Sequence, residues 1–202
     1  MKMSPLSNTK CGHHFLLSCA AVINLLEGTY VAYEGKFLVN NAPLSPLTIF
    51  GVGTFNAFSG HHQYRNRGGC TAVPNDGPIP AGKYWIVDRP KGGIRSQAYT
   101  WAQDTFNSAF GTPSNHNEWF ALYRDDGSID DITWVNGVRR GQFRLHPAGG
   151  QGISPGCITV PSHSDFMRIR NALIHTATIP VRSSGLRAYG TIEVITYGST
   201  CP

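Results

Sequence analysis

A histidine and a cysteine in the C-terminal half of the chain have the residue types and the spacing for nucleophilic catalysis. Cys157 follows His146 by 11 residues, and the segment between them consists mostly of glycine and other small residues. A thiolate is a strong nucleophile, and imidazole is the side chain best suited to accept its proton near neutral pH. Two strands joined by such a loop would bring the side chains together, so this pair predicts covalent catalysis by cysteine.

The residues around the pair fit the same chemistry. Gly156 permits a tight turn that would lift the Cys157 thiol out of the surface, and the backbone N–H groups of that turn would form an oxyanion hole. Arg144 shares a strand face with His146, where it would bind a substrate carboxylate or favour the thiolate. Ser154 would anchor the loop or bind near the sulfur. A backbone carbonyl is a candidate to orient the imidazole.

Each of these residues also has an ordinary structural interpretation. A cysteine beside a glycine is usually a small buried hydrophobe, and a lone histidine is usually structural or solvent-facing. The joint pattern is more specific than either residue alone. Adjacent His61 and His62 lie in a polar loop and are more often solvated than metal-bound, so we predict neither a metal nor a cofactor. The carboxylates of residues 125–131 lack the EF-hand spacing and predict a charged turn.

Composition predicts a single mostly-β domain. The 202 residues suffice for one sizeable core, and 23 glycines and 13 prolines with 11% aromatic residues favour a turn-rich β protein. The net charge of +5 is spread without a Lys/Arg-rich run, which argues against nucleic-acid binding. It suits an anionic polymer such as a bacterial cell wall, although solubility explains it equally well. The tryptophans are candidates for stacking on sugars, with core packing expected for most of them: Trp85, Trp101, Trp119 and Trp134.

The elements that must position the pair follow from residue patterns. Glu34-Gly35 between two β-like runs predicts a hairpin turn. Phe166, Ile169 and Leu173 form one stripe of a helix over 162–174, with Ser162 or Ser164 as its cap. Gly51 and Gly53 predict a bend within a β-rich segment. The strands are predicted over residues 29–33, 36–39, 47–58, 83–87, 118–123, 141–146 and 189–197, whereas 92–114 fits no regular pattern.

The N-terminus and the cysteines bear on cellular location. The apolar run 15–26 is too short to span a bilayer, so we expect no stable membrane insertion and assign residues 1–27 to an extension, either a helix or a signal-like segment. Residues 28–202 would form the catalytic domain. The odd number of cysteines leaves at least one free thiol, for which Cys157 is the obvious candidate. Cys70 and Cys201 are candidates for a disulfide in an oxidising compartment, although their spacing leaves the pairing open.

Taken together, these motifs resemble the L,D-transpeptidase (YkuD-like) superfamily. In its signature a histidine precedes a Ser-x-Gly-Cys element, here residues 154–157. The segment 77–86 looks like the second landmark of the family, a Pro-x-Gly-x-aromatic hairpin. With Phe58-Ser59-Gly60 added, the landmarks look most like the DUF2778 branch, which includes type VI secretion L,D-transpeptidase effectors. The resemblance covers roughly residues 28–197.

The resemblance implies a fold, a reaction and partners. The fold would be mainly β, a YkuD-like β-sandwich or partly open barrel with one or two short helices. His146 would be the general base, Cys157 the nucleophile, and Gly156 with Cys157 would line the oxyanion site. The enzyme would attack the L,D bond before the terminal D-alanine of a peptidoglycan tetrapeptide stem and form an acyl-enzyme. Water would then give L,D-carboxypeptidase activity, and an amine would give L,D-transpeptidation or D-amino-acid exchange.

The same resemblance implies where the protein acts. It would be made in the bacterial cytoplasm, secreted, and active in the periplasm of a target cell. A cognate immunity protein and a secretion-machine component would be its protein partners, besides the peptidoglycan stem peptides. Pro155 and Ile158-Thr159-Val160 depart from the housekeeping pattern and suit the effector branch better. A catalytically silent peptidoglycan-binding module is the alternative; a papain-like thiol protease is weaker because its cysteine precedes its histidine.

Overall fold

The computed structural model describes residues 32–89, 118–149 and 154–202. The predictions for residues 1–27, for 92–114, for Trp101 and for Cys11 and Cys19 lie outside these ranges. In the ranges described, no helix is both long enough and apolar enough to cross a membrane.

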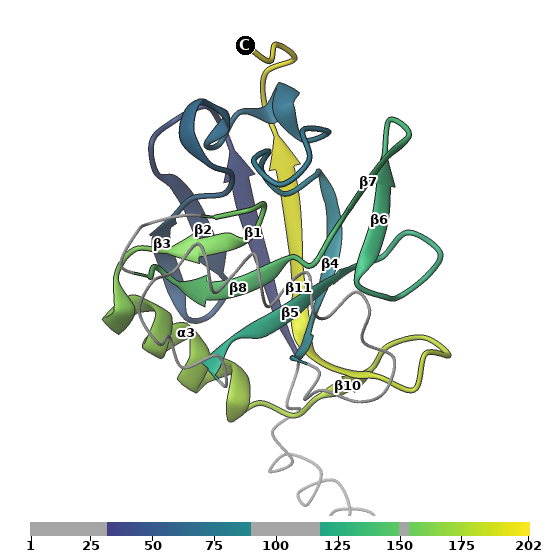
Figure 1. Ribbon diagram of the computed structural model, residues 1–202. Coiled ribbons are helices and arrows are strands. Elements are labelled where there is room, and N and C mark those ends of the chain that lie inside the picture. The colour runs from purple at the N-terminus through teal and green to yellow at the C-terminus, as the bar shows by residue number, and fades with distance from the viewer. Residues whose placement is uncertain (1–31, 90–117, 150–153) are drawn as a thin grey trace, which may run out of the picture. The chain divides into compact units, whose positions relative to one another are not determined.

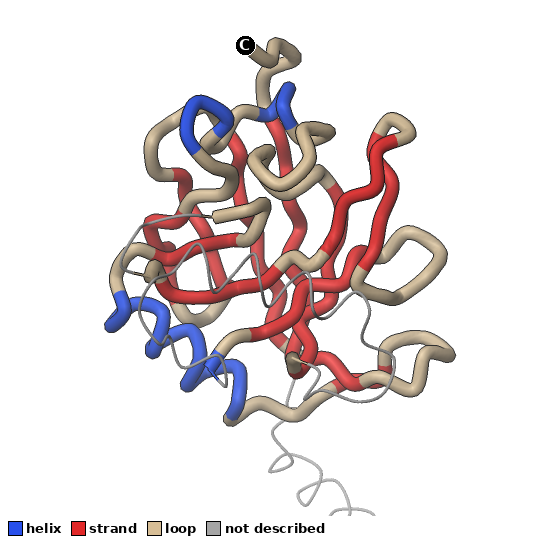
Figure 2. Tube along the Cα trace, viewed as in Figure 1, coloured by secondary structure: helices blue, strands red, loops and turns tan. Residues whose placement is uncertain are grey.

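Strands dominate the described chain, as the sequence predicts (Figure 2). The strands are β1 (Tyr33–Val39), β2 (Ser45–Ile49), β3 (Gly53–Ala57), β4 (Gly82–Asp88), β5 (Phe120–Arg124), β6 (Ile132–Val135), β7 (Val138–Gly141), β8 (Arg144–Pro147), β9 (Ile158–Val160), β10 (Ile179–Pro180) and β11 (Arg187–Thr196). The helical segments are the 3₁₀ turns η1 (His62–Tyr64) and η2 (Gly68–Cys70) and the α-helix α3 (His163–Ile174).

The main sheet curls into a nearly closed, barrel-like structure (Figure 1). Its strand order is β3-β2-β1-β11-β4-β5-β8-β9, with β10 added beside β11. Neighbours are antiparallel except for the parallel pairs β1–β11 and β8–β9. The two ends of this order meet because Phe58, just after β3, exchanges backbone hydrogen bonds of 2.9 and 2.8 Å with Thr159 of β9. The strands β6 and β7 form a separate hairpin.

Alternating burial and one amphipathic helix build the core. In β1, Phe37 and Val39 are buried and intervening residues are half-exposed, the period of a strand with one face on the core. The stripe predicted for α3 is buried against the same core. The helix begins after Ser162, whose side-chain oxygen accepts from the N–H of Asp165 at 3.2 Å, so the predicted cap is confirmed.

The hairpin predicted at Glu34-Gly35 is wrong. Both residues lie inside β1, which continues without a turn. The glycine is needed there for close packing rather than for a turn. A Cβ on Gly35 would lie 2.8 Å from Cδ1 of Ile49 and 2.9 Å from the carbonyl oxygen of Thr48.

The single strand predicted over residues 141–146 is also wrong, because the chain breaks between β7 and β8. Gln142 has a φ of 58°, in the left-handed region that interrupts a strand. Its N–H donates to the carbonyl of Asp131 at 2.9 Å, which holds the break against the start of the β6–β7 hairpin. The break turns the chain from the hairpin into β8 of the main sheet, where the histidine lies.

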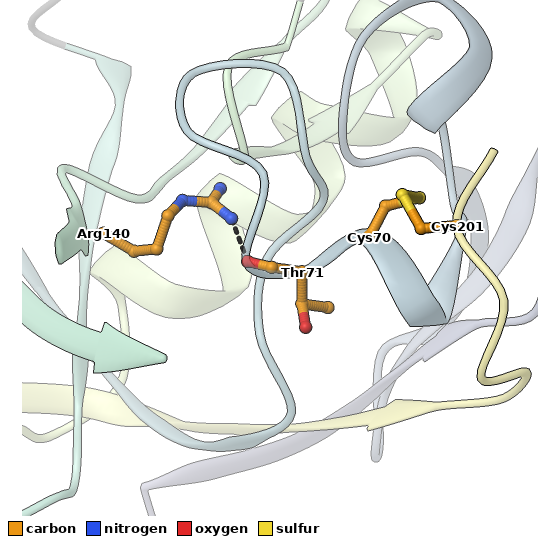
Figure 3. Close-up of a disulfide and its surroundings, with 4 residues drawn as sticks. All are labelled: Cys70, Thr71, Arg140 and Cys201. Carbon is orange, nitrogen blue, oxygen red and sulfur yellow. Dashed lines mark hydrogen bonds between the residues drawn. A yellow bond between two sulfur atoms is a disulfide. The ribbon is translucent and has the colours of Figure 1, made fainter. Parts of the chain in front are cut away.

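A disulfide joins the C-terminal end of the chain to η2. Cys70 and Cys201, separated by 131 residues in sequence, are bonded as the candidate pair suggested (Figure 3). Two glycines make the close approach possible. A Cβ on Gly68 would collide with the backbone of Tyr197, and one on Gly69 with the backbone of Thr200.

We predict that the disulfide contributes substantially to stability. A cross-link over a loop of this length restricts the unfolded chain and is worth about 2–5 kcal/mol. The double variant Cys70→Ser/Cys201→Ser should therefore unfold at a lower denaturant concentration than the oxidised wild type. Reducing agent should lower the wild-type midpoint toward that of the variant and leave the variant unchanged. Equal midpoints for oxidised and reduced wild type would contradict this prediction.

Candidate active site

The parallel pairing of β8 with β9 places the predicted histidine within one strand and the predicted cysteine directly before the neighbouring strand. The register pairs Leu145 with Ile158 and His146 with Thr159. Leu145 and Ile158 are buried in the core cluster. Because side chains alternate along a strand, His146 and Thr159 point to the opposite face, and Cys157, just before Ile158, points with them. Strand spacing and rise put the Cα atoms of His146 and Cys157 about 8 Å apart.

The His146 imidazole is buried and held from several sides. Its Nδ1 lies 2.7 Å from the carbonyl oxygen of Pro147. Because a carbonyl only accepts, Nδ1 carries the proton and Nε2 keeps its lone pair. The Thr159 hydroxyl, 3.2 Å from Nε2, therefore donates to it. The Trp119 ring stacks on the imidazole with 4.4 Å between centroids. A backbone carbonyl thus orients the histidine and leaves Nε2 as its basic atom.

The Cys157 thiol is fully buried, so the expectation that the Gly156 turn lifts it out of the surface is wrong. The Sγ–H faces the carbonyl of Gln142 at 3.8 Å, and a backbone hydrogen bond from Arg144 reaches the sulfur. Burial raises the pKa of Cys157 to about 12, although the charges of Arg144 and Arg140 act in the opposite direction. The thiol is therefore protonated in this structure at neutral pH.

The Arg144 guanidinium forms a two-pronged ion pair with Asp131. Nη1 and Nη2 each lie 2.6 Å from one carboxylate oxygen, and Nη1 also donates to the Phe143 carbonyl at 2.8 Å. Burial alone would lower the pKa of Arg144, but the hydrogen bonds and charge of Asp131 outweigh it and raise that pKa. Of the two roles predicted for Arg144, this arrangement favours support of the thiolate over binding of a substrate carboxylate, which stays a prediction.

Arg140 is a site residue that the sequence analysis missed. Its guanidinium is buried between the β6–β7 hairpin and the segment after η2, where it donates to the carbonyl of Thr71 (Figure 3). It also donates to the carbonyl of Gly77 at 2.8 Å. Burial lowers the pKa of Arg140 to about 10, so it remains charged at neutral pH. No local pattern marks it, because the groups that it binds lie more than 60 residues away in the sequence.

Gly156 packs against this arginine. Its φ is +87°, and a Cβ there would lie 2.7 Å from Nη2 of Arg140 and 3.1 Å from the Phe143 ring. The N–H of Gly156 donates to the Ser154 carbonyl at 2.8 Å. The Ser154 hydroxyl in turn donates to the Cys157 carbonyl at 2.7 Å. Ser154 therefore anchors the turn, which is one of the two roles predicted for it. Its predicted role in substrate binding stays a prediction.

The structure brings together the three sequence landmarks that carried the family resemblance. Ile79, in the second landmark, donates its N–H to the Ser59 hydroxyl at 2.7 Å. Phe58 pairs with Thr159, two residues after the cysteine. The carbonyl of Gly77 lies 3.3 Å from where a Cβ on Gly156 would be. Residues separated by up to a hundred positions thus converge on one turn.

Asp125, Asp131 and His61 each form a side-chain ion pair or hydrogen bond within the protein. Asp125 pairs with Arg182 at 2.7 Å, and Asp131 with Arg144, so the charged turn predicted over 125–131 is also where the partner of Arg144 lies. His61 lies 3.3 Å from Asp76. Over the described ranges, no group of three or more His, Cys, Asp or Glu is placed to hold a metal ion.

A carbonyl-oriented histidine in β8 and a cysteine directly before β9 define the class: a mainly β protein with a candidate cysteine–histidine site. The family model of the Tlde1 domain matches residues 53–184, more than half of the chain and the whole of this site. The chain therefore belongs to the Tlde1 domain family, a family of type VI secretion L,D-transpeptidase effector domains. No curated protein and no solved structure matches the chain.

We predict that Gly156→Ala disrupts the site beyond the cost of its backbone conformation. A non-glycine residue in the left-handed conformation lowers the free energy of unfolding by roughly 1–2 kcal/mol. At this position its Cβ would also collide with Arg140. Gly185→Ala is the matched control, because Gly185 has a φ of +74° and nothing within 4 Å of its added Cβ. Denaturant unfolding should show a clearly larger loss for Gly156→Ala. Equal losses would mean that the turn tolerates a side chain.

We predict that Cys157 of the free protein reacts slowly with iodoacetamide, at a rate that still climbs above pH 9. Only the thiolate reacts, and with a pKa of about 12 its fraction grows roughly tenfold per pH unit up to that value. Asp131→Asn should speed the reaction at a fixed pH, because the Asp131 charge raises the pKa of Cys157 while that of Arg144 lowers it. A reaction rate that stops rising near pH 7 would contradict the raised pKa of the buried Cys157 thiol.

Proposed function

We propose that this protein is a cysteine-dependent peptidoglycan L,D-transpeptidase or L,D-carboxypeptidase that acts on tetrapeptide stems through an acyl-enzyme. Its place would be the periplasm of a target bacterium, as an antibacterial type VI secretion effector. Membership of the Tlde1 domain family supports this. The sequence landmarks that resemble the YkuD-like superfamily and its DUF2778 branch support it as well. The single observation that carries the proposal is the meeting of the three landmarks at the turn that bears Cys157.

The chemistry would proceed by proton transfer and acyl exchange. The basic Nε2 of His146 takes the Cys157 proton, and the sulfur attacks the carbonyl carbon of the L,D bond. As the new S–C bond forms and the C–N bond breaks, the proton passes to the departing D-alanine amine. Water or an amine acceptor then releases the acyl group, and the sulfur regains a proton. Each transfer needs the Thr159 hydroxyl to release Nε2, to which it donates in the resting structure.

The turn supplies a candidate oxyanion donor. The N–H of Gly156 already donates to the Ser154 carbonyl. In this arrangement the N–H of Cys157 is therefore the group that would stabilise the negative charge on the substrate carbonyl oxygen. Gly156 acts there by shape, because it lets the turn pass beneath Arg140. The Arg144 guanidinium, held in place by Asp131, favours the thiolate once the proton has left, and the Asp131 charge opposes part of this effect.

Three observations at the site favour a second candidate, a catalytically silent peptidoglycan-binding module. Cys157 is fully buried, its pKa is about 12, and Nε2 of His146 is bonded to Thr159 in this structure. A silent module would bind sacculi and leave the length and cross-linking of the stem peptides unchanged. The two candidates therefore differ in the product and not in binding.

We predict that purified protein changes the muropeptide profile of sacculi and that Cys157→Ala does not. Mass spectrometry separates shortened stems, exchanged D-residues and new cross-links as distinct products. His146→Ala should lower the rate by about 10²–10⁴-fold, the usual contribution of a general base. His163→Ala is the matched control, since that histidine is 66% exposed at the start of α3. Identical profiles for wild type and Cys157→Ala would reject the enzyme and favour the silent module.

A further inference from the structure

Trp134 stands out among the described tryptophans because its side chain faces solvent. Trp85 and Trp119 are 9% and 3% exposed, as core packing requires, whereas Trp134 is 64% exposed. Leaving a large indole in water gives up the free energy of burying it. A single exposed hydrophobic residue is not by itself a binding site, so the surroundings of Trp134 decide what it can do. The core packing expected for most tryptophans therefore does not describe this one.

Trp134 borders a cleft of about 540 Å³ whose other lining residues are polar except for Ile132. Arg124, Asp126, Ser128 and Asp130 line it together with the β6 strand. An isolated apolar patch would suit a protein partner, but this cleft combines one flat aromatic face with carboxylates, a hydroxyl and a guanidinium. That combination matches a sugar ring, which offers an apolar C–H face for stacking and hydroxyl groups around its edge.

The polar groups of the cleft are held in place before any ligand arrives. Thr133 donates its hydroxyl to Asp126 and accepts from Nη1 of Arg124 at 3.1 Å. Nη2 of Arg124 is fixed by the Ala81 carbonyl at 2.6 Å, and Asp130 accepts from the backbone N–H of Ile132 at 2.7 Å. Side chains fixed in this way lose little conformational entropy when a ligand binds.

The hairpin that carries Trp134 also builds the candidate active site. Across β6 and β7, Thr133 pairs with Arg140 and Trp134 pairs with Arg139. Thr133 and Arg140 are buried, and Arg140 reaches the turn at Gly156, whereas Trp134 and Arg139 are exposed. One hairpin therefore carries both Arg140, which contacts the cysteine turn, and Trp134, which borders the cleft.

We propose that the Trp134 cleft binds the glycan strand of peptidoglycan, a polymer of N-acetylated hexosamines, while the attached stem peptide reaches Cys157. The indole face stacks on one sugar ring, and Asp126, Asp130 and Ser128 bond its polar edge. This inference rests on the proposed function, because it takes peptidoglycan as the substrate. It adds a second point of attachment, which would favour polymeric sacculi over free stem peptides.

The test separates glycan binding from catalysis. The probe is glycan strands freed of stem peptides by an amidase, titrated calorimetrically into Cys157→Ala protein, so no turnover is involved. Adding Trp134→Ala should weaken binding roughly 2- to 10-fold, the worth of one aromatic stacking contact, and Trp134→Tyr should restore most of it. Phe50→Ala, which removes a 55% exposed aromatic from another cleft, is the matched control and should bind like its parent.

A kinetic comparison in the active background completes the test. Trp134→Ala should slow the reaction on intact sacculi more than that on soluble tetrapeptide, by the same 2- to 10-fold factor. Undiminished binding of stripped strands by Trp134→Ala, no measurable binding by the parent, or an equal loss on both substrates would each overturn the inference. The activity of Cys157→Ala tests the proposed function and not the glycan-binding inference. If Cys157→Ala keeps full activity while Trp134→Ala still weakens strand binding, only the proposed function fails.

Discussion

The short strand β9 is the constraint on which the rest of the architecture depends. Its three residues pair in parallel with β8 on one edge and, through Thr159, with Phe58 on the other. The first contact fixes which residues of β8 and β9 share a face, and the second closes the sheet. Cys157 enters the strand directly from the Gly156 turn, so the position of the sulfur follows from the closure of the barrel-like sheet.

Closing the sheet at this point buries charge next to the thiol. Arg144 is compensated by Asp131, and Arg140 by backbone carbonyls from the segment after η2. Removing one partner of such a buried pair typically costs about 3–5 kcal/mol, because the other charge remains without compensation. The disulfide lies one residue before Thr71, whose carbonyl Arg140 binds, so the covalent link at the C-terminus and the environment of the cysteine belong to one packed unit (Figure 3).

Burial of the Cys157 thiol determines its protonation state and its accessibility. Desolvation dominates the pKa of Cys157 even though two arginines lie nearby, so positive charge alone does not activate this sulfur. The imidazole has a fixed tautomer with its basic nitrogen on the same face as the sulfur, but the Thr159 hydroxyl occupies that nitrogen. Under the proposed function, a substrate would therefore have to change the contacts of Thr159 and expose Sγ before the reaction begins.

Local pattern was sufficient for several elements. The stripe and cap of α3, the bend between β2 and β3, and the positions of strands β4 and β11 follow from local residue patterns, although β4 has four consecutive buried residues in place of the predicted alternation. The histidine–cysteine pair was also readable, because its glycine turn and flanking strands are contiguous in the sequence. The hairpin predicted at Gly35 was wrong, because a glycine at a turn and a glycine at a close approach between strands have the same local sequence pattern. Only the neighbouring strands distinguish the two cases.

The sequence by itself thus determined a mainly β protein with a candidate cysteine–histidine site. The tertiary structure alone decided that Asp131 neutralises Arg144, that Arg140 reaches the carbonyls of a distant segment, and that the thiol is buried. These contacts join residues from 13 to 69 positions apart. These contacts exist only because the sheet closes on itself. The same closure buries the Cys157 thiol, and this burial sets the charge state of the sulfur, so no local run of residues could have predicted it.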